Sequence, residues 1–208
     1  MPTVCKCDLS VIVPVYNLED YITPLLDSLK AQEVDDYTVE YIFVLNNCTD
    51  NSEKVIRESG LDCKIINCEI QGCGPARNAG FAESNGEYIW FMDGDDWLLG
   101  TRAIRDALDV AKAYGLRMLR LPFLSDRFGW NYFSMVWQYL FHRDLIEDIR
   151  FPRKQPAEDD EFTSAALAKL GLMPWGYLRL PSISYPLYYY NYGRVGSNMY
   201  RVAHGEQI

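Results

Sequence analysis

Short apolar runs alternate with amphipathic segments through the first 121 residues of the chain. The apolar runs indicate buried strands over residues 9–15, 39–45, 64–66, 87–92 and 117–121. The amphipathic segments indicate helices over residues 19–32, from a cap at 50–52 to a stop at 60, and over 75–85 and 101–114. Strands and helices that alternate in this order form parallel strands joined by crossover helices. The sequence therefore predicts an α/β sandwich with a mostly parallel central sheet.

Residues 122–208 have a different pattern, because aromatic residues gather between 130 and 141 and again between 185 and 192. Four acidic residues at 158–161 favour the start of a helix that runs to about residue 170, and the run at 185–194 indicates a further strand. We expect this small aromatic-rich region to pack on the same sheet. The prediction is a single domain over residues 1–208, with one half at about 8–121 and the other at about 122–208.

Composition and charge exclude some classes of function. The chain has 208 residues, of which 49% are hydrophobic, and a net charge of −9. An acidic chain binds nucleic acid poorly, because such binding needs clustered Lys and Arg, but one local site for a small anion is compatible with it. No apolar run approaches the roughly 20 residues that span a bilayer, so we expect no transmembrane segment. Residues 1–5 lack the pattern of a signal peptide, and we expect a cytoplasmic location.

The six cysteines indicate reduced, partly buried thiols and not a disulfide scaffold. Cys5 and Cys7 have the spacing of half a metal site. No matching pair follows them, and the two histidines, His142 and His204, lie far apart in the sequence. A zinc site is therefore the less favoured interpretation.

An acidic motif follows the predicted strand at 87–92. Asp93, Asp95 and Asp96 stand at the carboxyl end of that strand, and ligands of open α/β sheets bind at this edge. Carboxylates this close repel one another, so a cation such as Mg²⁺ or Mn²⁺ would compensate their charge. The alternative is an acidic turn in which Asp95 or Asp96 caps a helix.

A glycine-rich segment at 71–80 leads into a predicted helix, whose free N–H groups can face a phosphate. Arg77 lies in the first turn of this helix, where the helix dipole does not stabilise a cation. A role for Arg77 in binding a ligand, such as pairing with a diphosphate, is therefore more plausible. The segment is neither a P-loop nor a dinucleotide fingerprint, because its glycine spacing is wrong and it lacks the Gly-Lys-Ser/Thr ending. An ordinary strand–helix loop is the alternative.

Three further motifs allow a chemical and a structural interpretation. An acid within 158–161 can serve as a general base near the acidic motif, or can simply favour a helix start. The turn at 46–52 can meet a nucleotide at the edge of the sheet, or can cap the next helix. The aromatic residues at 185–192 can stack on sugar rings, or can pack against the sheet.

Taken in order, these motifs resemble those of family 2 glycosyltransferases with a GT-A fold. The resemblance runs from about residue 8 to residue 198 and rests on segments 10–17, 46–52, 76–78, 93–96, 158–162 and 187–190. Trp137 and residues 140–145 also resemble a stretch of bacterial cell-surface polysaccharide enzymes. The resemblance implies a Rossmann-like nucleotide-binding sandwich whose C-terminal region faces the acceptor.

The family's pattern implies roles for single residues on the donor side. Pro14, Val15 and Tyr16 would line the pocket for the base and ribose, and Asn46 would contact one of these two groups. Arg77 would reach the diphosphate.

The same resemblance assigns the metal site and the catalytic site. Asp93 and Asp95 stand at the family's DxD motif, so Asp95 would be the main ligand of Mn²⁺ or Mg²⁺, with Asp93 near the ribose or the metal. Asp159 would be the catalytic base, with Glu158 beside it.

The implied function is transfer of one sugar, with inversion, from a nucleoside-diphosphate sugar to a glycan or lipid-linked acceptor in cell-surface polysaccharide synthesis. A lipid-linked acceptor is compatible with peripheral contact at the inner membrane face.

The chain departs from the family in the turn after the second predicted strand. Leu45 and Asn46 stand where the family usually has two aspartates, and Asn46 carries no charge. A non-catalytic module of the same fold that binds nucleotide sugars is therefore the alternative. A sugar nucleotidyltransferase ranks last, because residues 14–17 occupy the place of its basic glycine-rich loop.

Overall fold

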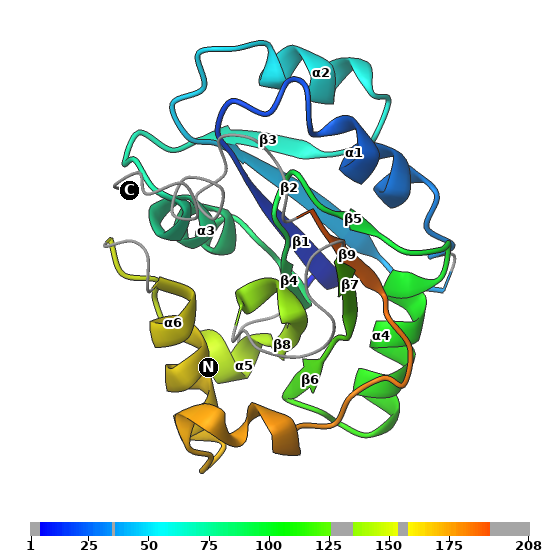
Figure 1. Cartoon of the computed structure of the whole chain (residues 1–208), viewed down its shortest axis with the longest axis vertical. Helices are drawn as coiled ribbons and strands as arrows, with labels where there is room; N and C mark the ends of the chain where they lie inside the picture. The colour runs from blue at the N-terminus through cyan, green and yellow to red at the C-terminus, as the bar shows by residue number, and fades with distance from the viewer. Residues whose placement is uncertain (1–4, 35, 126–134, 154–157, 192–208) are drawn as a thin grey trace.

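The apolar runs of the first half form five strands of a six-stranded sheet in the computed structural model of the chain (Figure 1). The structure describes residues 5–34, 36–125, 135–153 and 158–191. In spatial order the strands are β3 (Lys64–Asn67), β2 (Val39–Leu45), β1 (Cys7–Val15), β4 (Gly86–Phe91), β8 (Tyr139–His142) and β6 (Met118–Arg120). The first four are parallel, and β8 runs antiparallel to both of its neighbours. The predicted α/β sandwich with a mostly parallel sheet is confirmed.

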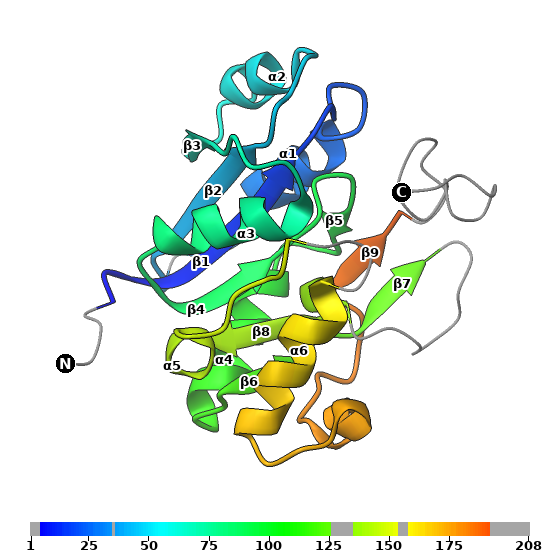
Figure 2. The ribbon, with the colours of Figure 1, turned by 90° about the vertical axis from the view of Figure 1, so that its left-hand side faces the viewer.

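Helices cover both faces of this sheet (Figure 2). One face carries α1 (Thr23–Lys30), α2 (Ser52–Glu58) and α4 (Ala103–Ala113), and the other carries α3 (Cys73–Ala82), α5 (Arg143–Ile146) and α6 (Glu158–Lys169). Val11 and Val13 of β1 pack into the first core, while Ile12 packs into the second. Burial on both sides explains why the sequence shows continuous apolar runs in place of strict alternation. Within the described ranges, no helix is long and apolar enough to cross a membrane.

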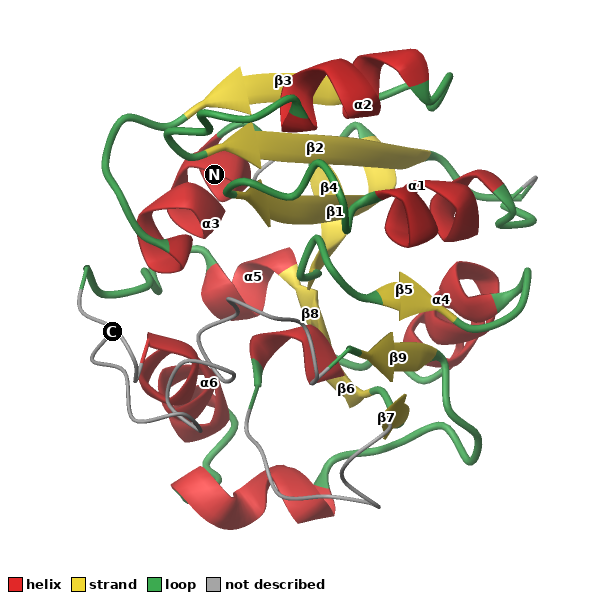
Figure 3. Cartoon of the chain, turned by 45° about the horizontal axis from the view of Figure 1, so that its top comes forward, coloured by secondary structure: helices red, strands yellow, loops and turns green. Residues whose placement is uncertain are grey.

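A second, smaller sheet consists of β5 (Trp97–Leu98), β9 (Tyr188–Tyr190) and β7 (Phe123–Ser125), in that order (Figure 3). Strands β5, β7 and β8 are not predicted from the sequence, because strands of two to four residues carry too little periodicity. Strand β9 is shorter than the predicted strand at 185–194, whose last three residues lie outside the described residues.

Aromatic residues of the second half contribute to both cores: Trp137 and Tyr188 belong to the first, and Tyr139 and Phe141 to the second. Two 3₁₀ helices, η1 (Val136–Gln138) and η2 (Pro174–Arg179), lie in this half. Trp137 of η1 stacks on Tyr188 and on Tyr190, with ring centroids 4.8 and 4.9 Å apart. Tyr188 is fully buried, whereas Tyr185 is exposed. The aromatic residues at 130, 132 and 133 lie outside the described residues.

Helix α1 begins later than residue 19, where the sequence predicts its start. The backbone N–H groups of Leu18 and Glu19 donate instead to the Ser52 hydroxyl at 2.7 Å and to the Asp50 carboxylate at 2.9 Å. These bonds tie the loop after β1 to the loop after β2. Pro24 has no N–H to donate to the carbonyl of Asp20, so the regular helix begins only at Thr23, with the proline in its first turn.

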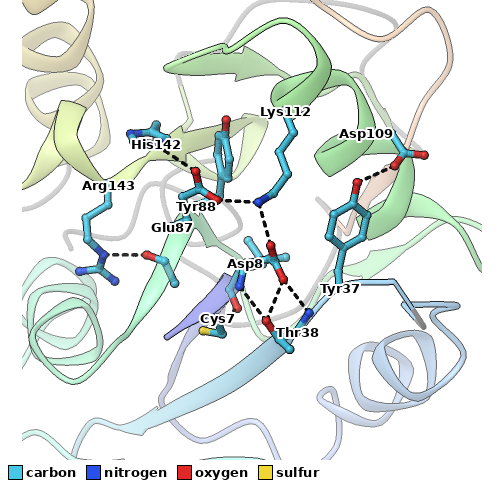
Figure 4. Close-up of polar contacts among 12 residues, drawn as sticks. Cys7, Asp8, Tyr37, Thr38, Glu87, Tyr88, Asp109, Lys112, His142 and Arg143 are labelled. Atoms are coloured by element: carbon cyan, nitrogen blue, oxygen red, sulfur yellow. Dashed lines mark hydrogen bonds and ion pairs between the residues drawn. The ribbon is translucent and has the colours of Figure 1, made fainter. Parts of the chain in front are cut away.

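Lys112 of α4 fastens that helix to the amino edge of the sheet (Figure 4). Its amine lies 2.7 Å from the Asp8 carboxylate of β1 and 2.5 Å from the Glu87 carboxylate of β4. Burial disfavours the charged amine, but the hydrogen bonds to Asp8 and Glu87 outweigh this effect and raise the pKa of Lys112. Partial burial likewise opposes ionisation of Asp8, yet hydrogen bonds from Lys112 and Thr38 lower the pKa of Asp8.

We predict that Lys112→Met lowers the free energy of unfolding at pH 7 by about 1 kcal/mol. The stabilisation that Asp8 supplies is present above its unfolded pKa of about 3.9 and is lost as the pH falls through its lower folded pKa. The difference between wild type and variant should therefore shrink below about pH 4. Urea denaturation at pH 7 and pH 3 measures both effects.

Lys54→Met is the matched control, because Lys54 pairs with Glu58 at 4.0 Å and both side chains are 68% exposed. We expect it to change the free energy of unfolding by less than about 0.5 kcal/mol. Equal losses in the two variants would contradict a special role for Lys112.

Candidate active site

The carboxyl ends of β1, β2 and β4 lie at one edge of the sheet, and Tyr16, Asn46 and Asp93 follow these strands. Pro14 and Val15 are the last two residues of β1 and are buried, whereas Tyr16 directly after the strand is 51% exposed. Of these three predicted pocket residues, Tyr16 therefore presents the largest free surface at this edge.

Arg77 joins two motifs that lie far apart in the sequence. Its Nη1 donates to Asp159 Oδ1 at 2.6 Å, and its Nη2 donates to Asp93 Oδ1 at 2.7 Å. The guanidinium is only 3% exposed and lies over the ring of Phe151, 5.4 Å from the ring centroid. The structure thus brings the predicted base, the first predicted metal ligand and the predicted diphosphate ligand into one ion-pair network.

The glycine-rich segment permits this arrangement through close packing. A Cβ atom at Gly74 would lie 2.5 Å from the carbonyl oxygen of Pro152, so only glycine allows α3 to approach this segment. One turn further along α3, the Asn78 side chain accepts from the Phe151 N–H and donates to the Phe151 carbonyl, both at 2.9 Å. These contacts fix α3, and with it Arg77, against the chain that leads to α6.

Asp159 lies in the first turn of α6 beside Glu158. Its second oxygen accepts the backbone N–H of Val136 at 3.2 Å. Burial raises the pKa of Asp159 above its ordinary value, although the Arg77 charge acts in the opposite direction. Burial also raises the pKa of Glu158, whose Oε2 has no hydrogen-bond partner among the described residues. Both carboxyl groups therefore hold a proton more readily than ordinary surface acids.

The acidic loop, residues 93–96, does not present three carboxylates to one ion as the sequence analysis expects. Asp93 and Asp95 are half-buried, but Asp96 is fully buried. Its carboxylate accepts the Tyr188 hydroxyl at 2.7 Å and the Asn191 backbone N–H at 2.8 Å. Asp96 also caps no helix, because β5 follows it directly. Both interpretations of Asp96 are therefore wrong, since this side chain joins the loop to β9.

Asp93 and Asp95 remain as a donor set for a cation. Within the described part of the chain, no three His, Cys, Asp or Glu side chains are grouped so as to hold a metal ion. Mg²⁺ commonly takes only one or two carboxylates and completes its shell with water and substrate phosphates. Two carboxylates on one loop therefore fit an ion that arrives with a diphosphate.

The Asn46 side chain makes three hydrogen bonds to backbone groups of the same chain. Its Nδ2 donates to the carbonyls of Cys68 and Ile70 at 2.9 and 2.8 Å, and its Oδ1 accepts the N–H of Gly72 at 2.8 Å. The residue is 4% exposed. These three bonds hold the loop that leads into α3, so Asn46 positions that loop, and its contact with a base or ribose stays a prediction.

Sequence reasoning missed several residues that build this site. Phe151 and the N–H of Val136 contact Arg77 and Asp159, and Tyr188 and Asn191 hold Asp96. Tyr188 and Asn191 both lie in the run at 185–194, which the sequence marks as a strand without indicating its contact with Asp96. The other contacts depend on backbone atoms or on packing, which leave no signal in the sequence.

Comparisons with known proteins extend these findings. A family model described as glycosyl transferase family 2 matches residues 10–167. EpsJ, an uncharacterized glycosyltransferase of Bacillus subtilis (strain 168), is 28% identical over 205 residues, which cover 78% of this chain and 58% of EpsJ. TarS, the poly(ribitol-phosphate) beta-N-acetylglucosaminyltransferase of Staphylococcus aureus (strain MW2), is 28% identical over 219 residues, which cover 91% of this chain and 36% of TarS.

Solved structures share the fold. The crystal structure of residues 1–349 of S. aureus TarS in complex with UDP-GlcNAc has a TM-score of 0.78 at 25% identity, covering 92% of this chain and 60% of that one. The mannosyltransferase PcManGT of Pyrobaculum calidifontis has a TM-score of 0.70 at 16% identity, covering 95% and 61%. At that identity the likeness concerns the fold alone. The predicted GT-A fold is confirmed, and the chain spans 36% to 61% of the length of these relatives.

We predict that Asn46→Asp lowers the free energy of unfolding by about 2 kcal/mol, because a carboxylate oxygen would then face two carbonyl oxygens in a buried place. Chemical denaturation at pH 7 measures the loss. Asn47→Asp is the matched control, because the Asn47 side chain is exposed and makes one hydrogen bond, to the Glu69 carbonyl at 3.3 Å. We expect that control to stay within about 0.5 kcal/mol of wild type, and an equal loss would show that Asn46 has no special role.

Proposed function

This chain belongs to glycosyl transferase family 2, and from that membership we propose that it transfers one sugar from a nucleoside-diphosphate sugar to a hydroxyl group of an acceptor. The observation that carries the proposal is the Arg77 network. It brings Asp159, a partly buried carboxylate suited to act as a base, close to Asp93 of the acidic loop at the carboxyl edge of the sheet.

The donor and acceptor classes follow from the relatives. TarS has been crystallised with UDP-GlcNAc, so a UDP-sugar is the first donor class to test. TarS acts on poly(ribitol phosphate), which supports a cell-surface glycan or a lipid-linked saccharide as the acceptor here. A cytoplasmic site of action, with peripheral contact at the inner membrane face, is part of the same proposal.

We infer a single in-line displacement that inverts the anomeric carbon. The acceptor oxygen forms a bond to that carbon while the bond to the diphosphate breaks, and the proton of the acceptor hydroxyl passes to Asp159. The raised pKa of Asp159 favours proton uptake. Arg77 and the Val136 N–H orient the carboxylate, since each bonds one of its two oxygens.

We propose that Asp95 and Asp93 hold Mg²⁺ or Mn²⁺ together with the donor. When bound, such an ion offsets the negative charge that grows on the leaving diphosphate. Asp93 also accepts from Arg77, so this loop is held from the side of α3 before any ligand arrives.

A non-catalytic module that binds nucleotide sugars is the second candidate. The observation that favours it is Asn46, whose side chain is engaged within the chain where the family usually has an aspartate. Slow hydrolysis of the donor in the presence of Mn²⁺ separates the two candidates, because a binding module releases no free sugar.

We predict that Asp159→Asn lowers kcat by at least about a hundredfold, because an amide cannot accept the proton. The Kd of the donor, measured by calorimetry, should stay within a few-fold of wild type. Glu161→Gln, an exposed position on the same turn of α6, should leave both values unchanged. Loss of donor binding in Asp159→Asn would show that Asp159 serves the structure or the metal instead.

Asp95→Ala tests the metal role. We expect the Kd of UDP measured with Mn²⁺ to rise by about tenfold or more, because a carboxylate ligand is lost. The control is Asp62→Ala, which removes an exposed carboxylate in the loop before β3 and should have no effect. If EDTA leaves nucleotide binding by the wild type unchanged, the metal role is wrong.

A further inference from the structure

The Tyr188 hydroxyl links the two ends of the acidic loop. It donates to Asp96 Oδ2 at 2.7 Å, and it accepts the backbone N–H of Asp93 at 3.1 Å. Tyr188 and Asp96 are both 0% exposed. One buried oxygen therefore fixes the start of the loop through its backbone and the end of the loop through a side chain.

The residue that follows β9 completes this frame. The Asn191 backbone N–H donates to Asp96 Oδ1 at 2.8 Å, and the Asn191 side-chain amide donates to the Asp95 carbonyl at 3.2 Å. The backbones of Asp93 and Asp95 are thus both held by a segment that lies more than ninety residues further along the chain.

The position of the Tyr188 hydroxyl is itself set by the core. The tyrosine ring stacks on Trp137 with an interplanar angle of 11°. The Trp137 carbonyl accepts the indole N–H of Trp90 at 2.9 Å, which ties η1 to β4. Val136, the neighbour of Trp137, donates its N–H to Asp159. One short helix, η1, therefore supports both the tyrosine that holds the acidic loop and the proposed base.

Burial of the Asp96 carboxyl group needs a physical explanation. A carboxyl group that is fully buried costs free energy, and such groups are usually paired with a cation. Across the described residues, no Lys, Arg or His lies within ion-pair distance of Asp96. In the part of the chain that the structure describes, its two oxygens accept from Tyr188 and Asn191, so the buried acid serves to orient these groups.

We propose that Tyr188 and Asp96 are a positioning pair that holds the backbone of Asp93 and Asp95 in the geometry needed to bind the donor. The inference rests on the proposed function, since it assigns these two residues to donor binding. It is distinct from the roles of Asp93, Asp95 and Asp159, because both residues of the pair are fully buried and act through the backbone of the loop.

Tyr188→Phe tests the pair, because it removes the hydroxyl and keeps the ring that stacks on Trp137. Tyr139→Phe is the matched control: Tyr139 is also fully buried, and its hydroxyl has no hydrogen-bond partner among the described residues. The first measurement is amide hydrogen exchange at Asp93 by NMR, without metal or nucleotide. We expect exchange to be about tenfold faster in Tyr188→Phe and unchanged in Tyr139→Phe.

The second measurement is the kinetics with a UDP-sugar donor, at a temperature where circular dichroism shows both variants folded. We expect kcat/KM to fall by about tenfold to a hundredfold in Tyr188→Phe, through a higher donor KM, and to stay near wild type in Tyr139→Phe. Asp96→Asn should show a similar loss, and the double variant should lose little more than the worse single variant, because the two residues act as a unit.

Two results overturn the proposal. One is an Asp93 amide that exchanges at the wild-type rate in Tyr188→Phe, and the other is faster exchange with a donor KM equal to that of the Tyr139→Phe control. Failure of the proposed function is seen elsewhere, in a wild-type protein that neither binds nor transfers any nucleotide sugar. The exchange experiment then still decides whether the hydroxyl orders the loop.

Discussion

The site depends on a buried guanidinium that must have two carboxylates beside it. Taking a cation out of water costs several kcal/mol unless it is paired and hydrogen-bonded, and Arg77 is 3% exposed. Asp93 and Asp159 supply the pairing, so neither can move far without leaving a buried charge uncompensated. The acidic loop after β4 and the first turn of α6 are therefore held at a fixed separation by one side chain of α3.

Close backbone approach is what lets these elements meet. A Cβ at Gly80 of α3 would clash with Ile12 of β1, and a Cβ at Gly94 of the acidic loop would lie 2.5 Å from Leu18 Cδ1. Gly74 is equally close to Pro152. Gly74 and Gly80 belong to the segment in which the sequence suggests a phosphate contact, and in this structure they let α3 pack closely on its neighbours. Gly94 does the same for the acidic loop.

Features set by the local pattern of residues could be predicted from the sequence, whereas features set by contacts between distant residues could not. The predicted strand at 39–45 has the observed ends, because a strand that is buried on both faces has a continuous run of apolar residues. Helix α1 begins four residues later than predicted, because Pro24 has no N–H for an intrahelical bond and is tolerated only in the first turn of a helix. Asp96 could not be told apart from Asp95, since the Tyr188 partner that buries it is 92 residues away. The resemblance to a family named the right motifs, but the Arg77 bridge that joins them comes from tertiary packing.

The charge balance of the site explains why a cation is a reasonable part of the proposal. Asp93, Asp159 and Glu158 lie close enough to influence one another, and their mutual repulsion adds to the burial that raises the pKa of Asp159 and Glu158. Among the described residues, Arg77 is the one cation within ion-pair distance of Asp93 and Asp159. A diphosphate that bound beside these carboxylates would therefore face more negative than positive charge. Positive charge brought by the ligand's own divalent ion would reverse that balance, and the two half-buried carboxylates of the acidic loop are where such an ion would be received.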